Sequence, residues 1–294
     1  MPGVQIDPSD VTACYPELTV LDRLGNGTFK QVFKVRNSAN EEFVIKCVQL
    51  DVDDFGQITR MSAVEERLRL EVGLMAAVDD PHVPSLGPIE SRDFTKQGFT
   101  VRAFSEEFIG EQTVESLLGL QHFDAVKLKK LLHDVASALK VYNDHETGFV
   151  HRDVKPGNIV LRESDQSYVL IDPGVHLAPS NPTISNPADW PQGTPAYYSP
   201  EQAQGTRRQL DVRSDMFSLG IIAYQAITGT HPFNPTAADP TWLGRLINAQ
   251  YNQLDTATYP DYASCIPIVH KLLGRFPHAR YNSPEALLLM VEEL

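Results

Sequence analysis

A short stretch near the middle of the chain carries side chains that are suited to moving a phosphoryl group. It reads F-V-H-R-D-V-K-P-G-N-I-V-L and runs from Phe149 to Leu161. Asp153 can accept a proton, Lys155 can neutralise a phosphate and Asn158 can bind a metal ion, all within six positions. The apolar residues at both ends predict a polar loop held between two short buried strands.

A second acid follows another apolar run. Residues 168–171 read Y-V-L-I, which predicts a buried strand, and the strand ends at Asp172, followed by Pro173 and Gly174. Together with Asn158, Asp172 would give two oxygen ligands, the kind that a hard cation such as Mg²⁺ prefers when it bridges phosphates.

The elements that must position these groups begin with a glycine-bearing turn. Apolar residues alternate on both sides of Gly25 and Gly27, which predicts a β-hairpin. Glycines there let backbone N–H groups approach a phosphate closely. An ordinary hairpin turn explains the same pattern equally well.

Lys46 ends an apolar run, F-V-I-K, that predicts a strand. A lysine in a buried strand needs an anionic partner, whereas one on an edge strand would point into solvent. The helix predicted after Ser62 carries Glu71 beside its apolar face, formed by Leu68, Val72, Met75 and Val78. Glu71 can therefore turn inward to pair with Lys46, although a solvated glutamate fits the helix as well.

The composition changes near residue 110. Residues 83–109 alternate apolar and polar side chains, which predicts two more strands followed by an extended linker at 107–110. Helical periodicity then covers 113–120 and 124–143. We expect an α+β fold with a strand-rich first part and a helix-rich remainder, and a nucleotide site where the two meet.

The bulk properties exclude several classes of protein. The 294 residues carry a net charge of −13 without a basic stripe, which argues against a nucleic-acid partner. The three cysteines, Cys14, Cys47 and Cys265, are far apart and suit a reducing cytoplasm. We find no apolar run of membrane-spanning length and no signal peptide, so we expect a cytoplasmic protein without a membrane partner.

From about residue 18 onward the sequence resembles the eukaryotic-like, or Hanks-type, serine/threonine protein kinases, and it looks most like their bacterial members. The motifs in family order are G-x-G at Gly25 and Gly27, V-I-K at Lys46, Glu71, H-R-D-V-K-P-G-N, D-P-G, S-P-E ending at Glu201, D-x-x-S-x-G from Asp215, and Arg280. The resemblance implies a two-lobed fold with an N-terminal extension at 1–17, an N-lobe at 18–109 and a C-lobe at 110–294, which together form a single catalytic domain over 18–294.

The resemblance also implies the role of each residue. Asp153 and Lys155 would be catalytic, and Asn158 and Asp172 would hold Mg²⁺, or Mn²⁺ in its place. Lys46, paired with Glu71, would bind the ATP phosphates. The remaining nucleotide-binding positions would be Gly25, Gly27, Val32, Val44, Glu107, Ile109 and Val160. The substrates would be serine and threonine hydroxyls of proteins, including those of the kinase itself, while the oligomeric state stays open.

The sequence departs from the family at two positions. Pro173 replaces a phenylalanine, and Lys30 stands where a third glycine is usual. A pseudokinase, which binds nucleotide but has lost catalysis, and a small-molecule phosphotransferase with a similar loop are therefore the alternatives. Arg152 suggests control by phosphate in the segment after Asp172, for which the candidates are Ser180, Thr183 and Ser185.

Overall fold

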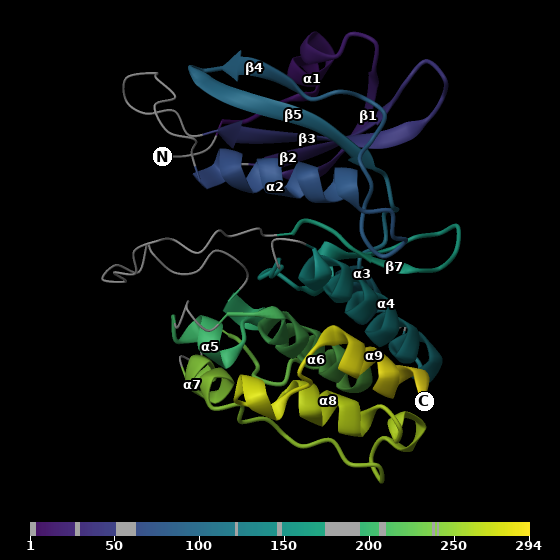
Figure 1. Ribbon diagram of the computed structural model, residues 1–294, viewed down its shortest axis with the longest axis vertical. Coiled ribbons are helices and arrows are strands. Elements are labelled where there is room, and N and C mark those ends of the chain that lie inside the picture. The colour runs from purple at the N-terminus through teal and green to yellow at the C-terminus, as the bar shows by residue number, and fades with distance from the viewer. Residues whose placement is uncertain are drawn as a thin grey trace. The chain divides into compact units, whose positions relative to one another are not determined.

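The computed structural model describes residues 4–26, 30–50, 63–120, 123–145, 149–173, 195–205, 210–236, 239 and 241–294. The chain divides into two compact units. The first unit comprises Met1–Asp79 and Pro84–Phe108, and the second comprises Asp80–Val83 and Ile109–Leu294. Figure 1 labels the elements of both, and each unit is described by itself.

The first unit is built on an antiparallel sheet with the strand order β1-β2-β3-β5-β4. Its elements are α1 (Pro8–Cys14), β1 (Thr19–Asn26), β2 (Lys30–Arg36), β3 (Glu42–Leu50), α2 (Ala63–Ala77), β4 (Arg92–Lys96) and β5 (Phe99–Glu107). The predicted hairpin is confirmed, since β1 and β2 pair in antiparallel register from Thr19 opposite Arg36 to Asn26 opposite Gln31.

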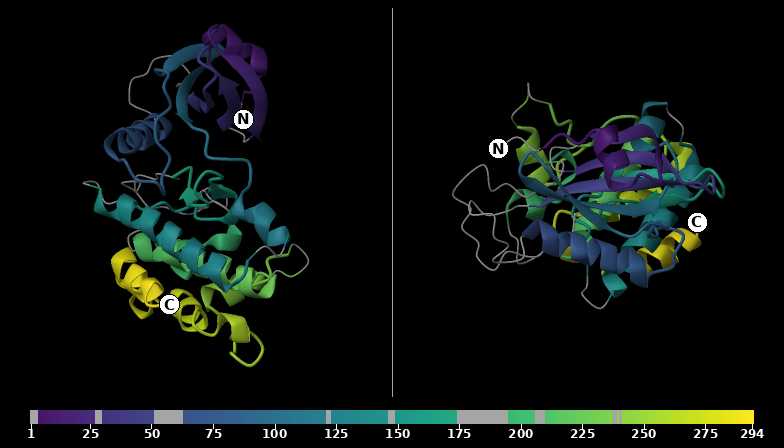
Figure 2. Two further views of the ribbon diagram at one scale, coloured as in Figure 1. Left: turned by 90° about the vertical axis from the view of Figure 1, so that its right-hand side faces the viewer. Right: turned by 90° about the horizontal axis from the view of Figure 1, so that it is seen from above.

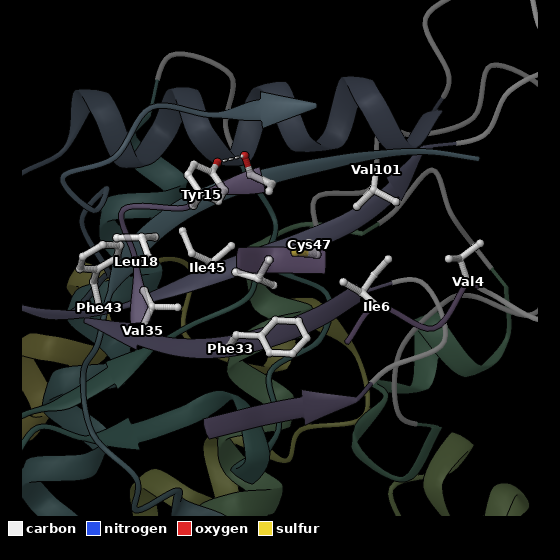
Figure 3. Close-up of a cluster of buried hydrophobic side chains, with 12 residues drawn as sticks. Val4, Ile6, Tyr15, Leu18, Phe33, Val35, Phe43, Ile45, Cys47 and Val101 are labelled. Carbon is white, nitrogen blue, oxygen red and sulfur yellow. Dashed lines mark hydrogen bonds between the residues drawn. The ribbon is translucent and has the colours of Figure 1, made fainter. Parts of the chain in front are cut away.

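Alternation along β3 divides the apolar residues of the first unit between two faces of the sheet. Phe43, Ile45 and Cys47 point to the face covered by α1 and the N-terminal segment, where Val4, Ile6, Val11, Tyr15 and Leu18 complete a core (Figure 3). The Tyr15 hydroxyl donates to the carbonyl oxygen of Ala103 over 3.0 Å. The sequence analysis did not predict α1, although Asp7 and Asp10 form a capping box around Pro8.

The other face of the sheet packs against α2. Leu50 and Phe104 from the sheet meet Leu68 and Met75 from the helix in a second apolar cluster. Figures 1 and 2 show α1 and α2 on opposite sides of the sheet. Because Lys46 lies next to Ile45 and Cys47 in β3, its side chain points to the α2 face, as the period of a strand requires.

The second unit is mainly helical. Its first part holds α3 (Val114–Gly119), α4 (Ala125–Asp144), η1 (Pro156–Asn158), β6 (Ile159–Leu161) and β7 (Tyr168–Leu170). The remainder holds η3 (Pro195–Tyr197), α5 (Pro200–Ala203), α6 (Val212–Thr228), α7 (Trp242–Ile247), η5 (Pro260–Tyr262), α8 (Ile266–Leu272), η6 (Pro277–Ala279) and α9 (Pro284–Glu292).

Helix boundaries in the second unit follow their capping residues. The Thr113 and Asp124 side chains accept backbone N–H groups at the first turns of α3 and α4, the two helices predicted at 113–120 and 124–143. The apolar face predicted for α4 is buried from Leu128 to Tyr142. The helix α6 ends at Gly229, whose φ of 72° is a left-handed conformation that glycine adopts without strain.

One prediction about the central loop is wrong. Phe149 and Val150 do not form a strand, because neither residue has a ladder partner among the described residues, and only the C-terminal flank becomes a strand. That flank is β6, which pairs with β7 from Ile159 opposite Leu170 to Leu161 opposite Tyr168. The Phe149 N–H instead donates to the carbonyl oxygen of Tyr142 in α4 over 3.0 Å.

Within the described part of the chain, no helix combines the length and the apolar composition that crossing a bilayer requires.

Candidate active site

The central loop brings its three polar side chains together. The Lys155 ammonium lies 2.7 Å from Asp153 Oδ2, and Asn158 Nδ2 donates to the same oxygen over 3.0 Å and to the Asp153 carbonyl over 2.9 Å. The Asp153 and Lys155 side chains keep 19% and 28% of their surface exposed. The carboxylate is therefore fixed in direction but remains accessible to a reacting hydroxyl.

The ring of His151 is fully buried and supports this loop through two contacts. Its Nδ1 accepts the backbone N–H of Asp153 over 3.3 Å, and its Nε2 lies 3.1 Å from the carbonyl oxygen of Ile171. An N–H donor at one nitrogen and an acceptor at the other define a neutral ring that is protonated at Nε2. Burial lowers the pKa of His151 to about 4, so the ring stays neutral at physiological pH.

We expect the buried His151 to make the protein lose stability in mild acid. Its pKa is lower in the folded chain than its ordinary value, so the unfolded chain takes up the proton first as the pH falls. The stabilisation is complete above about pH 6.5 and is lost towards pH 4, with a slope of about 1.4 kcal/mol per pH unit. Denaturant unfolding from pH 4 to 8 measures this slope.

The comparison that isolates the ring is between the wild type and His151→Gln. Asp215 also titrates in this window, because burial raises its pKa to about 7, and its contribution has the opposite sign. Both proteins contain Asp215, so the difference between their curves reports His151. Parallel curves for the two proteins would contradict a proton taken up by this ring on unfolding.

Asp215, from the first turn of α6, fixes the backbone at the start of the loop. Its two carboxylate oxygens accept the N–H groups of His151 over 2.8 Å and of Arg152 over 2.7 Å. Two successive N–H groups converge on one acid because Arg152 takes a left-handed φ of 64°. Asp215 therefore fixes the backbone that leads directly into Asp153, the next residue of the loop.

A buried ion pair between Arg280 and Glu201 is linked to the central loop. The Arg280 guanidinium binds Glu201 through two hydrogen bonds of 2.7 and 2.8 Å, and Ser214 donates to the same carboxylate over 2.7 Å. Burial acts to raise the pKa of Glu201, but Arg280 outweighs it, so the pKa lies below its ordinary value. Next to Glu201, Gln202 Nε2 donates to the carbonyl of Arg152 over 3.2 Å, which links this network to the central loop.

In the first unit, Lys46 is buried with 2% of its side chain exposed and has two acidic neighbours. Its ammonium lies 3.6 Å from Glu71 Oε1 in α2, which is the contact that the sequence analysis expected. It lies closer still to Glu106 of β5, whose side chain is 3% exposed. The alternative in which Lys46 points into solvent is therefore wrong.

Glu106 is the neighbour that sequence reasoning missed. The strands β3 and β5 pair in a register that places Val44 opposite Glu106 and Lys46 opposite Phe104, so the lysine and the acid share one face. A signal was available, because Glu106 lies two residues from the buried Phe104 and alternation puts both on the same side of β5. The register pairs two distant segments, so it cannot be predicted from the sequence of either strand alone.

The remaining positions predicted to bind the nucleotide lie in several different elements of the two units. Gly25 lies opposite Val32 in the β1–β2 pair, and an added Cβ would touch the Val32 side chain at 3.4 Å. Ile109 and Val160 pack together in one apolar cluster of the second unit. Val44 is buried in β3, and Glu107 ends β5, where its carboxylate accepts the Ser85 hydroxyl over 3.1 Å. Gly27 and the candidate phosphorylation sites Ser180, Thr183 and Ser185 lie outside the described residues.

Comparison with known sequences decides the family. The protein kinase domain matches this chain over residues 18–289. The chain belongs to the protein kinase family. The two units of this kinase, one built on an antiparallel sheet and one mainly helical, confirm the predicted α+β, two-lobed fold class.

The kinase is similar to several curated bacterial proteins. It is 31% identical over 276 residues to the serine/threonine-protein kinase PksC of Streptomyces coelicolor. The matched residues make up 90% of this chain and 47% of that protein. It is 27% identical over 275 residues to the serine/threonine-protein kinase pkn2 of Myxococcus xanthus, covering 91% of this chain and 31% of that protein. The kinase therefore spans less than half the length of these two relatives.

Protein kinases use ATP and a divalent cation, and the residues of this kinase fit a cation. Both bonds from the Asn158 amide nitrogen go to Asp153, which leaves the amide Oδ1 as the atom to ligate. Asp172 follows β7 with a left-handed φ of 58°, and the N–H of Ile171, just before it, donates to the carbonyl of Asn158 over 2.9 Å. That bond holds the two oxygen-bearing side chains on neighbouring segments.

Proposed function

We propose that this kinase transfers the γ-phosphoryl group of ATP to serine and threonine hydroxyls of proteins. The observation that carries the proposal is the bonding of Asp153, whose carboxylate is held by both Lys155 and Asn158 while part of it stays exposed. A carboxylate fixed in this way is suited to orienting a hydroxyl and accepting its proton. The similarity to serine/threonine kinases supports the choice of substrate class.

In this mechanism Asp153 accepts the proton of the attacking hydroxyl. Lys155, whose ammonium already lies 2.7 Å from Asp153, neutralises charge on the transferring phosphoryl group. We further propose that Asn158 and Asp172 hold Mg²⁺, which when bound neutralises the charge of the phosphates. His151 and Asp215 act by positioning the loop, because each bonds to its backbone.

Most of the residues that bind the nucleotide in this proposal belong to the first unit. Lys46 interacts with the phosphates, while the glycine-bearing β1–β2 hairpin, Val32 and Val44 contact the rest of ATP. Glu107, Ile109 and Val160 complete the set of proposed nucleotide contacts. The chain has three free cysteines and no disulfide, which supports a reducing, cytoplasmic setting for this activity.

A labelling experiment tests the substrate class. The kinase is incubated with γ-radiolabelled ATP, Mg²⁺ and a generic basic protein, and in parallel with a panel of sugars and aminoglycosides. We expect label in the protein and, after acid hydrolysis, on phosphoserine and phosphothreonine. Label on the small molecules alone would favour the small-molecule phosphotransferase, and label on tyrosine alone would overturn the proposed specificity.

We expect Glu106→Gln to tighten ATP binding by about 5- to 10-fold, or about 1 kcal/mol. In the present arrangement the Lys46 ammonium faces two carboxylates, and phosphate would have to share it with both. Removing the Glu106 charge leaves Lys46 with one acid and removes the repulsion between Glu106 and the phosphates. Titration with ATP measured by calorimetry gives the dissociation constant.

The matched control for this substitution is Glu65→Gln. Glu65 is another acid of the first unit, but it pairs with Arg102 at 3.5 Å instead of with Lys46. The control should leave ATP affinity unchanged. Weaker ATP binding in Glu106→Gln than in the control would mean that Glu106 holds Lys46 in its binding position, contrary to the expectation.

A further inference from the structure

One group of side chains in the second unit has the composition of a metal site and lies apart from the central loop. Among the described residues, His82, His133 and Asp134 each place one potential ligand atom within 4.8 Å of the others. His82 comes from the Asp80–Val83 segment, and the other two come from α4. Asp134 is 1% exposed, and acids are rarely buried to this extent unless they are paired.

The two carboxylates around His82 favour a positive charge at this place. Its Nδ1 lies 2.9 Å from Asp80 Oδ1 and its Nε2 lies 3.5 Å from Asp134 Oδ1. A neutral imidazole has one N–H, so it cannot donate to a carboxylate from both nitrogens. The carboxylate 3.5 Å from the second nitrogen therefore favours a proton or a metal ion there. His133 brings a second imidazole nitrogen to the same Asp134 oxygen, since its Nδ1 lies 3.0 Å away.

The separations suit a small tetrahedral ion. Ligands bonded to zinc at its usual distances lie about 3.3 Å apart in tetrahedral geometry, and the two separations from Asp134 Oδ1 are 3.0 and 3.5 Å. Asp80 would support His82 from behind, in the way that a carboxylate commonly supports a metal-bound histidine. The other oxygen, Asp134 Oδ2, accepts the Tyr168 N–H over 2.9 Å, which leaves Oδ1 as the ligand.

We propose that His82, His133 and Asp134 form a zinc site that ties the Asp80–Val83 segment to α4. Zinc would bind His82 Nε2, His133 Nδ1 and Asp134 Oδ1, with water in the fourth position. The proton displaced from His82 would pass to solvent, and the neutral His133 ring would carry its proton on Nε2. The His133 side chain is 39% exposed, which gives the ion a path of entry. The Lys130 ammonium, 3.0 Å from Asp134 Oδ2 and 41% exposed, can move outward when zinc arrives.

Zinc binding to the purified full chain tests the site, with zinc alone as the probe and a chromophoric chelator as competitor. We expect His133→Ala to weaken the tightest zinc binding by at least about 10-fold, as loss of a site's supporting groups typically does. His82→Gln should have the same effect. Cobalt in place of zinc should give the absorption of a tetrahedral site in the wild type and lose it in both variants.

The control is His278→Ala, which removes an exposed histidine that stacks on Phe276 and is not a member of the cluster. It should bind zinc and cobalt like the wild type. Thermal unfolding provides a second readout, because zinc should raise the midpoint of the wild type and of the control but not that of His133→Ala. Equal zinc affinity in the wild type and His133→Ala would overturn the site, and the cluster would then be held by protons alone.

Discussion

An Asp153→Asn variant is expected to bind ATP like the wild type and to transfer phosphoryl groups about 10²- to 10⁴-fold more slowly. Asparagine keeps the shape of the side chain and an oxygen that can still accept the Asn158 amide, which in the wild type lies 3.0 Å away. It cannot accept the substrate proton. Single-turnover transfer of labelled phosphate to protein, with ATP affinity measured separately, gives both quantities.

A suitable control is Asp261→Asn, which changes an exposed acid of η5 and should leave the rate unchanged. This comparison also decides between the enzyme and the pseudokinase. A pseudokinase would bind ATP in all three proteins and give equal, background incorporation of label in each. Equal label in the wild type and Asp153→Asn would therefore disprove the proposed mechanism.

The second large effect concerns stability. Arg280→Met is expected to lower the free energy of unfolding by about 3–5 kcal/mol, because it leaves the Glu201 carboxylate buried without its partner. The Arg280 side chain is 0% exposed, and it also donates to the backbone carbonyls of Arg213, Gly274 and Arg275. Because domains are typically stable by about 5–15 kcal/mol, much of the stability would disappear. Denaturant unfolding followed by circular dichroism measures the loss.

The double variant Glu201→Gln with Arg280→Met separates the pair from its surroundings. Removing both charges should recover part of the loss, because no unpaired buried charge remains. The control is Lys140→Ala, which breaks an ion pair with Asp144, one turn further along α4, in which both side chains are more than 40% exposed. It should change stability little. A comparably small loss in Arg280→Met would contradict a structural role for the buried pair.

Local signals in the sequence were sufficient for most of the elements. The helices expected over 113–120 and 124–143 form as α3 and α4, and the alternation around Gly25 gives the β1–β2 hairpin. Such features depend on residues a few positions apart, so propensity and period determine them. The order of the catalytic motifs likewise predicted the family, because each motif is short and contiguous.

Pairings between distant segments were not predictable in this way. Glu106 reaches Lys46 only through the register of β3 and β5, and His82 reaches Asp134 only where its segment packs on α4. Neither Glu106 nor His82 lies in a sequence pattern from which its partner could be predicted. The prediction of a strand at Phe149 and Val150 failed for a related reason, since a short apolar run becomes a strand only when another strand is placed to pair with it.

The bonds from Asp215 to the backbone of His151 and Arg152 bear on how the central loop meets a substrate. Two successive N–H groups that converge on one point form an anion nest, a geometry that often captures phosphate from solution. Here an acid of the protein fills the nest, and it offsets the left-handed conformation of Arg152, which costs about 1–3 kcal/mol in such residues. The loop is thereby ordered before any ligand arrives. Binding energy from the substrate is then not consumed in ordering the loop and remains for the reacting groups.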